Sequence, residues 1–385
     1  MKTKNTPLCT GKEWKCQQCK TWVDKERYFS NQHICGEYQC SNCKEFVTEG
    51  HRCYIQKIDK IPEPAKNVWS CDFEAKICEG GLHIVNLAIA ENLDTNERQI
   101  FTSIEDFTEW GVNLKNATLV FHNGKAYDTW MIHQHIIKYT GDRPKKLILA
   151  GNKIMSMTIK SVRFIDSINH FASSLEGLPK MFGIKELKKG YYPYTFNTEA
   201  NQGYVGSIPD IKFYEPERMK PEKKKDFEKW YKAQDKNALW DLQKETLEYC
   251  ISDVVLLKEA LNVYRKNAIE FNRGLDPLLH PTIASYCMKV YRTNHLKDSK
   301  TVGVLTQKEY DFIRRSFFGG RTEVFTCHKK WNKNRAVVQF CNNHLKKLGI
   351  KSTKKSRKEF MTTKIYGRYL DFQSLYPYVQ YYKDM

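Results

Sequence analysis

The sequence has no uninterrupted run of about eighteen apolar residues, so it predicts no membrane-spanning helix. Its first residues, MKTKNTPLCTGKEWKC, also lack the apolar segment that a secretory signal requires. We therefore expect an intracellular protein in a reducing compartment, where its 13 cysteines are not expected to form disulfides. Acidic residues are too few to balance the basic ones, which leaves a formal net charge of +19 and a pI near 9.2. This surplus favours a polyanionic partner, nucleic acid first; a merely soluble basic surface is the alternative.

Residues 1–55 have few aliphatic side chains, too few for a core of their own. They hold seven of the 13 cysteines and two histidines, in a unit CxxC followed by HxC that occurs twice. This spacing predicts a module that binds two structural Zn²⁺ ions. The eight expected ligands are Cys16, Cys19, His33, Cys35, Cys40, Cys43, His51 and Cys53. Tandem fingers and a cross-brace both fit the pattern, and the partner of the module could be DNA or a protein.

Residues 56–66, with two prolines and several charges, are expected to form a linker. The alternating segments VWSCDFEA and GGLHIVNLAIA, joined near Gly80–Gly81, predict two adjacent strands. Residues two apart on a strand share a face, so Asp72 and Glu74 project together. Paired carboxylates on an apolar strand are costly unless cations lie between them.

Two later segments add carboxylates. In NATLVFHNGKAYDTWMI, a strand is followed by a helix that begins near Asp128. The amphipathic segment KETLEYCISDVVLLKEALNVY predicts a helix with Tyr249 and Asp253 on one face. The four carboxylates would suit two divalent metal ions that cut a phosphodiester by in-line attack of water. Tyr249 would orient that water through a hydrogen bond.

In this order, the motifs CDFEA, HNGKAYD and YCISD resemble the proofreading 3′→5′ exonuclease domain of family B DNA polymerases. DFQSLYP resembles the first polymerase motif of that family. SFFGGR resembles the link motif of its protein-primed branch, which serves viruses, linear plasmids and self-synthesising DNA transposons. The resemblance covers roughly residues 67–385.

The resemblance implies an α/β fold: an RNase H-like 3′→5′ exonuclease domain with a mixed sheet flanked by helices at residues 67–270. The zinc-binding module at residues 1–55 would precede it, and a link region with an incomplete polymerase palm at residues 271–385 would follow.

Further site residues are implied by the same resemblance. The first polymerase motif would supply Asp371, Ser374, Leu375, Tyr376 and Pro377. DNA contacts would come from Asn123, Tyr127, Ser167, Phe317, Gly319 and Gly320. The exonuclease metals, Mg²⁺ or Mn²⁺, would be held by Asp72, Glu74, Asp128 and Asp253.

The expected function is that of a DNA-directed DNA polymerase with a proofreading exonuclease, acting on a single-stranded 3′ end and a primer-template. A terminal priming protein is an expected partner. Polymerisation is not expected from this chain alone, because the motif with the second palm aspartate is not found. The alternative is a catalytically inactive, zinc-dependent protein that binds nucleic acid or another protein. KKSRK at residues 354–358 would suit a nuclear address. Residues 188–236, rich in Tyr, Pro and Lys, are expected to form a long surface insertion.

Overall fold

The structure, a computed structural model, is divided into two units, one up to Leu305 and one from Thr306 onward. It describes residues 13–184, 190–235 and 238–317, together with residues 339, 342–343, 345–346, 349–353 and 355–356. Within this described part no helix is both long enough and apolar enough to span a membrane. In the second unit, α9 (Gln307–Arg314) begins with a capping box between Thr306 and Glu309.

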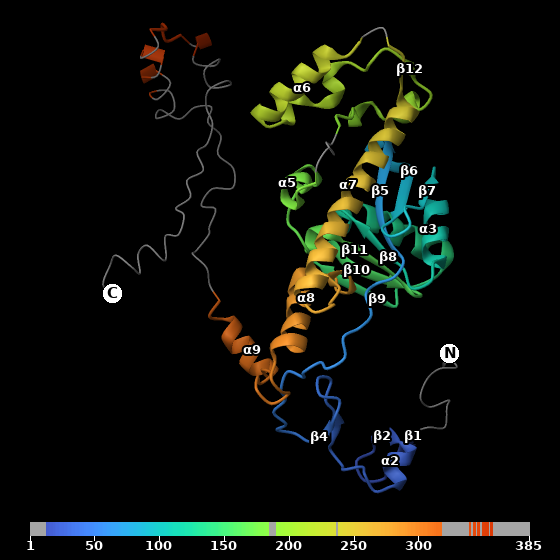
Figure 1. Ribbon diagram of the computed structural model, residues 1–385. Helices are drawn as coiled ribbons and strands as arrows, with labels where there is room; N and C mark the ends of the chain where they lie inside the picture. The colour runs from blue at the N-terminus through green and yellow to red at the C-terminus, as the bar shows by residue number, and fades with distance from the viewer. Residues whose placement is uncertain are drawn as a thin grey trace. The chain divides into compact units, whose positions relative to one another are not determined.

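A seven-stranded mixed sheet is the centre of the first unit (Figure 1). Its strands are β5 (Val68–Ile77), β6 (His83–Asn92), β7 (Arg98–Phe101), β8 (Thr118–Phe121), β9 (Lys146–Ala150), β10 (Lys153–Ile159) and β11 (Val162–Asp166). They lie in the order β7-β6-β5-β8-β11-β10-β9. The pairs β5–β8 and β8–β11 are parallel, whereas β6 is antiparallel to both of its neighbours. The expected α/β fold with a mixed sheet is confirmed.

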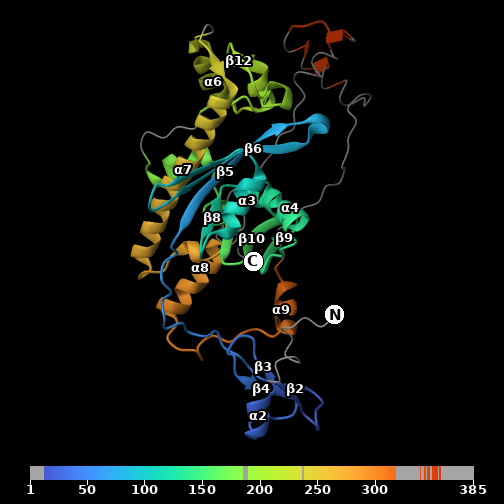
Figure 2. The same cartoon turned by 90° about the vertical axis from the view of Figure 1, so that its right-hand side faces the viewer.

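Helices cover both faces of the sheet (Figure 2). On one face α3 (Ile104–Asn113) and α4 (Asp128–His135) bury Phe107 and Ile132 against Phe73 and Leu119. On the other face α7 (Leu242–Phe271) is the long helix that the sequence predicts, and its apolar stripe includes Val254. The sheet therefore has an apolar core on each side, which fixes β5 between α4 and α7.

Residues 190–235, expected to form a surface insertion, have a small aromatic core, while most of their side chains stay at least partly exposed. Their aromatic side chains pack on one another, and Phe227 and Tyr214 are buried. The rings of Tyr214 and Phe227 lie 5.3 Å apart, and Tyr191 packs edge-on against Phe227. The segment holds α6 (Pro221–Ala233) and the strand β12 (Val205–Gly206), which pairs with β13 (Trp240–Asp241). Composition did not reveal this core, because aromatic residues can form one without aliphatic ones.

A buried polar network of hydrogen bonds lies around His170 in the first unit. It joins the loop after β11 to the chain beyond α7, near α5 (Leu178–Phe182) and α8 (Ile283–Val290). His170 lies there between the Tyr264 hydroxyl, 3.1 Å from Nδ1, and the His280 carbonyl oxygen, 2.9 Å from Nε2. Burial lowers the pKa of His170 to about 4.

Acid is expected to weaken the fold through His170. Since the pKa falls from 6.5 to about 4 on folding, the unfolded chain binds more protons between these values. The neutral imidazole therefore stabilises the fold fully above pH 6.5, and this contribution, on the order of 3 kcal/mol, is lost as the pH falls towards 4. Urea unfolding of wild type and His170→Gln should show the deficit of the variant shrinking from pH 7 to pH 4. Equal pH slopes for the two proteins would contradict this role.

Candidate functional site

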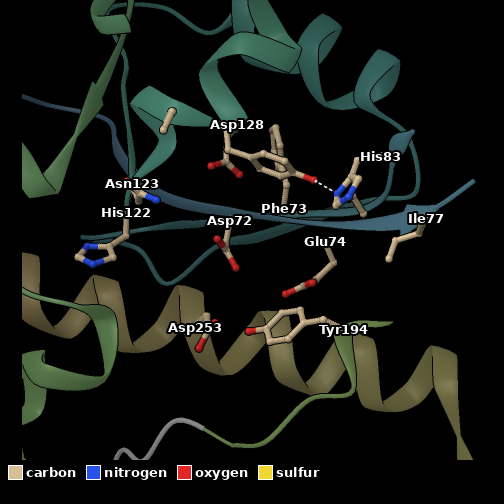
Figure 3. A pocket seen from close by; sticks show the side chains of 13 residues that line it. Asp72, Phe73, Glu74, Ile77, His83, His122, Asn123, Asp128, Tyr194 and Asp253 are labelled. Carbon is tan, nitrogen blue, oxygen red and sulfur yellow. Dashed lines mark hydrogen bonds between the residues drawn. The ribbon is translucent and has the colours of Figure 1, made fainter. Parts of the chain in front are cut away.

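A pocket of about 570 Å³ opens where β5, the start of α4 and α7 meet (Figure 3). Four of the carboxylates that the sequence singled out line it, together with two histidines and aromatic rings. The polar and aromatic residues in its lining include Asp72, Glu74, His83, His122, Asn123, Tyr127, Asp128, Tyr194 and Asp253. The pocket therefore collects side chains from three motifs that are up to 181 residues apart in the chain (253 − 72).

Three carboxylates form the centre of this pocket. Asp72 and Glu74 point from β5 towards Asp253 on α7, as Figure 3 shows. One oxygen of each lies within 4.8 Å of the others. Like charges this close repel one another strongly unless a proton or a cation lies between them. Oxygen donors in this number are the ligands of Mg²⁺ or Mn²⁺, so the group could hold a metal ion.

Asp128 is held beside these three by the turn that follows β8. Asn123 adopts a left-handed conformation with φ of 70°. A Cβ on Gly124 would lie 2.5 Å from the Cβ of Phe121, so this tight turn requires glycine. The buried Asp166 carboxylate accepts hydrogen bonds from the backbone N–H groups of Asn123 and Lys125, at 3.1 and 2.9 Å. Burial and the charge of Asp166 raise the pKa of the Asp128 carboxyl to about 7.

Next to Glu74 and Asp253 the tyrosine that lines the pocket is Tyr194, not the expected Tyr249. Tyr249 lies on α7 one turn before Asp253, as predicted, but it is buried and does not line the pocket. Its hydroxyl is hydrogen-bonded to that of Tyr194, and its ring stacks on Tyr192 at 4.9 Å. Burial raises the pKa of Tyr249 far above its ordinary value, so it keeps its proton.

Asn197 fixes the segment that carries Tyr194 to the strand that carries Glu74. The pairing of β5 with β6 shifts register between Glu74 and Ala75. Beside this bulge, Asn197 donates from Nδ2 to the backbone carbonyl of Ala75 at 3.1 Å. The backbone carbonyl of Asn197 accepts a hydrogen bond from the Ile77 N–H at 2.8 Å. Asn197 is fully buried. Neither Tyr194 nor Asn197 was expected from the sequence, because neither lies in a motif with the carboxylates.

The DNA-contact positions implied by the resemblance fall in different places. Asn123 and Tyr127 line the pocket, and the Tyr127 hydroxyl is 2.9 Å from His83 Nδ1. Ser167 is fully buried; its hydroxyl donates to the Phe121 carbonyl and lies 2.8 Å from His122 Nδ1, so it meets the pocket only through His122. Phe317 is exposed and belongs to the second unit. Gly319, Gly320 and the motif residues Asp371, Ser374, Leu375, Tyr376 and Pro377 lie outside the described residues.

Two further groups of metal-ligating side chains lie near the start of the chain. One contains Cys16, Cys19, His33 and Cys35, and the other contains Cys40, Cys43, His51 and Cys53. Within each group the ligand atoms lie within 4.8 Å of one another, so neighbouring pairs come together in tandem. Each CxxC turn follows a short hairpin strand: β1 (Glu13–Lys15) pairs with β2 (Trp22–Asp24), and β3 (Tyr38–Gln39) pairs with β4 (Phe46–Val47). Three thiolates and one imidazole form a ligand set that suits tetrahedral Zn²⁺.

Arg27 links the first ligand group to the second hairpin, through a salt bridge on one side and an aromatic ring on the other. His33 Nδ1 lies 2.7 Å from a Glu37 oxygen, which leaves Nε2 to face the cysteines. Arg27, in α2 (Lys25–Phe29), pairs with Glu37 and stacks over the Phe46 ring of the second hairpin at 3.5 Å. The two hairpins are therefore packed as one module.

Residues 110–338 match the family model described as DNA polymerase type B, organellar and viral. A probable DNA polymerase of Podospora anserina is 31% identical over 196 residues, which is 48% of this chain and 15% of that protein. One of Ascobolus immersus is 28% identical over 46% of this chain and 16% of that protein. The chain thus spans about a sixth of the length of these curated relatives.

Solved structures give a weaker match. Phi29 DNA polymerase complexed with single-stranded DNA has a TM-score of 0.37 and 16% identity, over 58% of this chain and 34% of that chain. The family B DNA polymerase of the archaeon Pyrobaculum calidifontis has a TM-score of 0.32 and 15% identity, over 63% of this chain and 30% of that chain. At these scores, family membership rests on the sequence match.

Proposed function

Because this chain belongs to the organellar and viral type B DNA polymerases, we propose that its carboxylate pocket removes nucleotides from the 3′ end of single-stranded DNA. The observation that carries the proposal is the convergence of Asp72, Glu74 and Asp253 within 4.8 Å, with the buried Asp128 lining the same pocket. The curated relatives are named as probable DNA polymerases, and we place this activity in a protein that takes part in DNA synthesis.

Each side chain has a role in the hydrolysis of the terminal phosphodiester. Asp72, Glu74 and Asp253, with Asp128, would hold divalent metal ions, which supply an activated water and neutralise charge on the phosphate. Tyr194, whose hydroxyl is hydrogen-bonded to that of Tyr249, would present this hydroxyl to the water or to the scissile phosphate. Tyr127 offers a partly exposed ring on which the terminal base can stack. Water attack on phosphorus releases the 3′ hydroxyl of the shortened strand and a nucleoside 5′-monophosphate.

Digestion of a 5′-labelled single-stranded oligonucleotide with Mg²⁺ or Mn²⁺ tests this function. We expect a ladder that shortens from the 3′ end and disappears with a chelator. A folded, metal-supplemented protein that binds the strand and leaves it intact would instead support the alternative of an inactive nucleic-acid-binding protein.

We also propose that residues 13–53 bind two Zn²⁺ ions, one in each group of four ligands. The basis is the donor chemistry, three sulfurs and one imidazole nitrogen in each group, with His33 oriented by Glu37. These residues carry six basic and six acidic side chains, so the strong positive charge of the chain lies elsewhere.

Elemental analysis of the purified protein is expected to give two zinc ions per chain. Cys43→Ser should reduce this number to one, because Cys43 belongs only to the second group. The control is Cys287→Ser, an exposed cysteine on α8 outside both groups, which should keep two. Loss of both ions in Cys43→Ser would indicate that the groups share ligands as a cross-brace does.

A further inference from the structure

A second, smaller pocket lies next to the carboxylate pocket and shares one residue with it. It has a volume of about 210 Å³, and His83 lines both pockets. Its walls come from the start of β6, the start of α3 and the end of α4. The polar and aromatic side chains in its lining are His83, Glu105, Gln134, His135, Lys138 and Tyr139. Two adjoining pockets with a common wall suit neighbouring units of one polymer.

Besides apolar side chains such as Ile84 and Met131, the lining of this second pocket holds an aromatic ring beside a cation. Tyr139 is 62% exposed although its ring packs against His135, with ring centres 4.9 Å apart and planes at 33°. Lys138 Nζ lies 4.9 Å from the centre of the Tyr139 ring. A flat aromatic face beside a cation is the arrangement on which single-stranded nucleic acid stacks its bases.

The backbone at this position departs from the ordinary helix. After α4 the chain widens into a π-helical turn over Ile136–Thr140, and this turn carries both Lys138 and Tyr139. Such turns are rare, and they occur frequently at functional sites. Since α4 also carries Asp128 at its first residue, one helix connects the two pockets.

The one acidic side chain in the lining of the second pocket indicates which part of a nucleotide the pocket can accept. Glu105 lies at the pocket, with its carboxylate 3.6 Å from His135 Nδ1. A phosphate there would meet this negative charge, whereas a base offers amino groups and ring edges that Glu105 and Gln134 can hydrogen-bond. The pocket therefore suits a base, with the phosphate on the side of Lys138.

The residue that the two pockets share, His83, contacts the ring of Tyr127 in the carboxylate pocket. His83 Nδ1 and the Tyr127 hydroxyl are 2.9 Å apart, and the two rings are nearly perpendicular. Figure 3 shows this hydrogen bond at the edge of the carboxylate pocket. If the terminal nucleotide lies on the Tyr127 side, the next base meets the His83 side. We propose that the second pocket binds the base of the penultimate nucleotide of a single-stranded 3′ end, a proposal that rests on the exonuclease function above.

The test pairs a change in the protein with a change in the strand. Binding of 5′-labelled oligonucleotides is measured with Ca²⁺, for wild type and Tyr139→Ala, with the penultimate base present or replaced by an abasic site. Either change alone is expected to weaken binding by about 5- to 150-fold, the range for one base–aromatic stack. The two changes together should weaken it no further, because both remove the same contact. Tyr291→Ala, an exposed tyrosine outside both pockets, should bind as the wild type does.

Additive effects of the two changes would overturn the proposed subsite. So would wild-type protein that binds the abasic strand as tightly as the intact strand, and so would wild-type protein that binds neither strand. Moving the abasic site five nucleotides from the end should abolish its coupling to Tyr139. Because binding is read without cleavage, the outcome is separate from that of the digestion experiment. If Tyr139→Ala and the abasic site are coupled in binding but no cleavage occurs with Mg²⁺, the proposed exonuclease activity alone is overturned. If cleavage occurs and the two changes are not coupled, the proposed subsite alone is overturned.

Discussion

Asp72→Ala is expected to lower the rate of 3′-nucleotide release by at least about 10³-fold. Asp72 lies within 4.8 Å of both Glu74 and Asp253, so its loss removes one of the three carboxylates that could hold a metal ion. Metal ions at such centres contribute several kcal/mol to the transition state, and each 1.36 kcal/mol corresponds to a factor of ten. Single-turnover digestion of a labelled strand measures the rate.

Stability separates this loss of activity from a loss of folding. Without metal, Asp72 is one of three crowded carboxylates, so its removal should leave the melting temperature of the metal-free protein unchanged or raise it. Asp94→Asn, a change in the exposed turn after β6, is the matched control and should retain the wild-type rate. A variant Asp72→Ala that is stably folded and still digests the strand at the wild-type rate would exclude this carboxylate from catalysis.

Asp276→Ala is expected to reduce the free energy of unfolding by about 3–5 kcal/mol. The Asp276 side chain is fully buried and pairs with Arg265 on α7 at 2.8 Å. It also accepts hydrogen bonds from the backbone N–H groups of Ala65 and Leu278, both at 2.8 Å. Alanine would leave a buried guanidinium without this carboxylate and two buried N–H groups without their acceptor. Urea unfolding followed by circular dichroism gives the value.

The site of Asp276 explains the size of the effect. The carboxylate joins three segments: the approach to β5, the far part of α7 and the chain just beyond α7. Asp298→Ala removes a carboxylate that caps an exposed turn, and it should cost far less. Comparable losses in the two variants would show that burial of the Asp276 network contributes little.

Local patterns predicted the elements of this fold and the order of its motifs. The alternation in β5 and β6 and the apolar stripe of α7 are visible within ten or twenty residues of sequence, and the carboxylates lie on those elements. Tyr249 was assigned to the face of Asp253 by helical spacing, and this is where it lies. That spacing could not reveal Tyr194, which comes from a separate segment and lies between Tyr249 and the pocket.

Other features depend on packing between distant segments, which composition does not encode. Residues 190–235 are rich in Tyr and Lys and read as a polar surface, yet their rings bury one another. Asn197 and His83 lie in no motif. The sequence alone does not show that Asn197 binds β5 next to Glu74 or that His83 contacts Tyr127. The eight proposed zinc ligands were predicted from spacing, but the choice between tandem and cross-braced pairing depends on how two very short hairpins fold.

The pairing of β12 with β13 has a consequence for how this protein can change over evolutionary time. Val205 and Gly206 lie opposite Asp241 and Trp240, so the chain leaves and returns at the same place. Closing a loop costs only slightly more entropy when the loop is made longer. The chain between these two strands can thus gain residues while Asn197 still holds Tyr194 against β5, provided that Phe213 and Phe227 keep their contacts with Phe196 and Tyr191. Insertions are therefore expected to accumulate there outside the aromatic core.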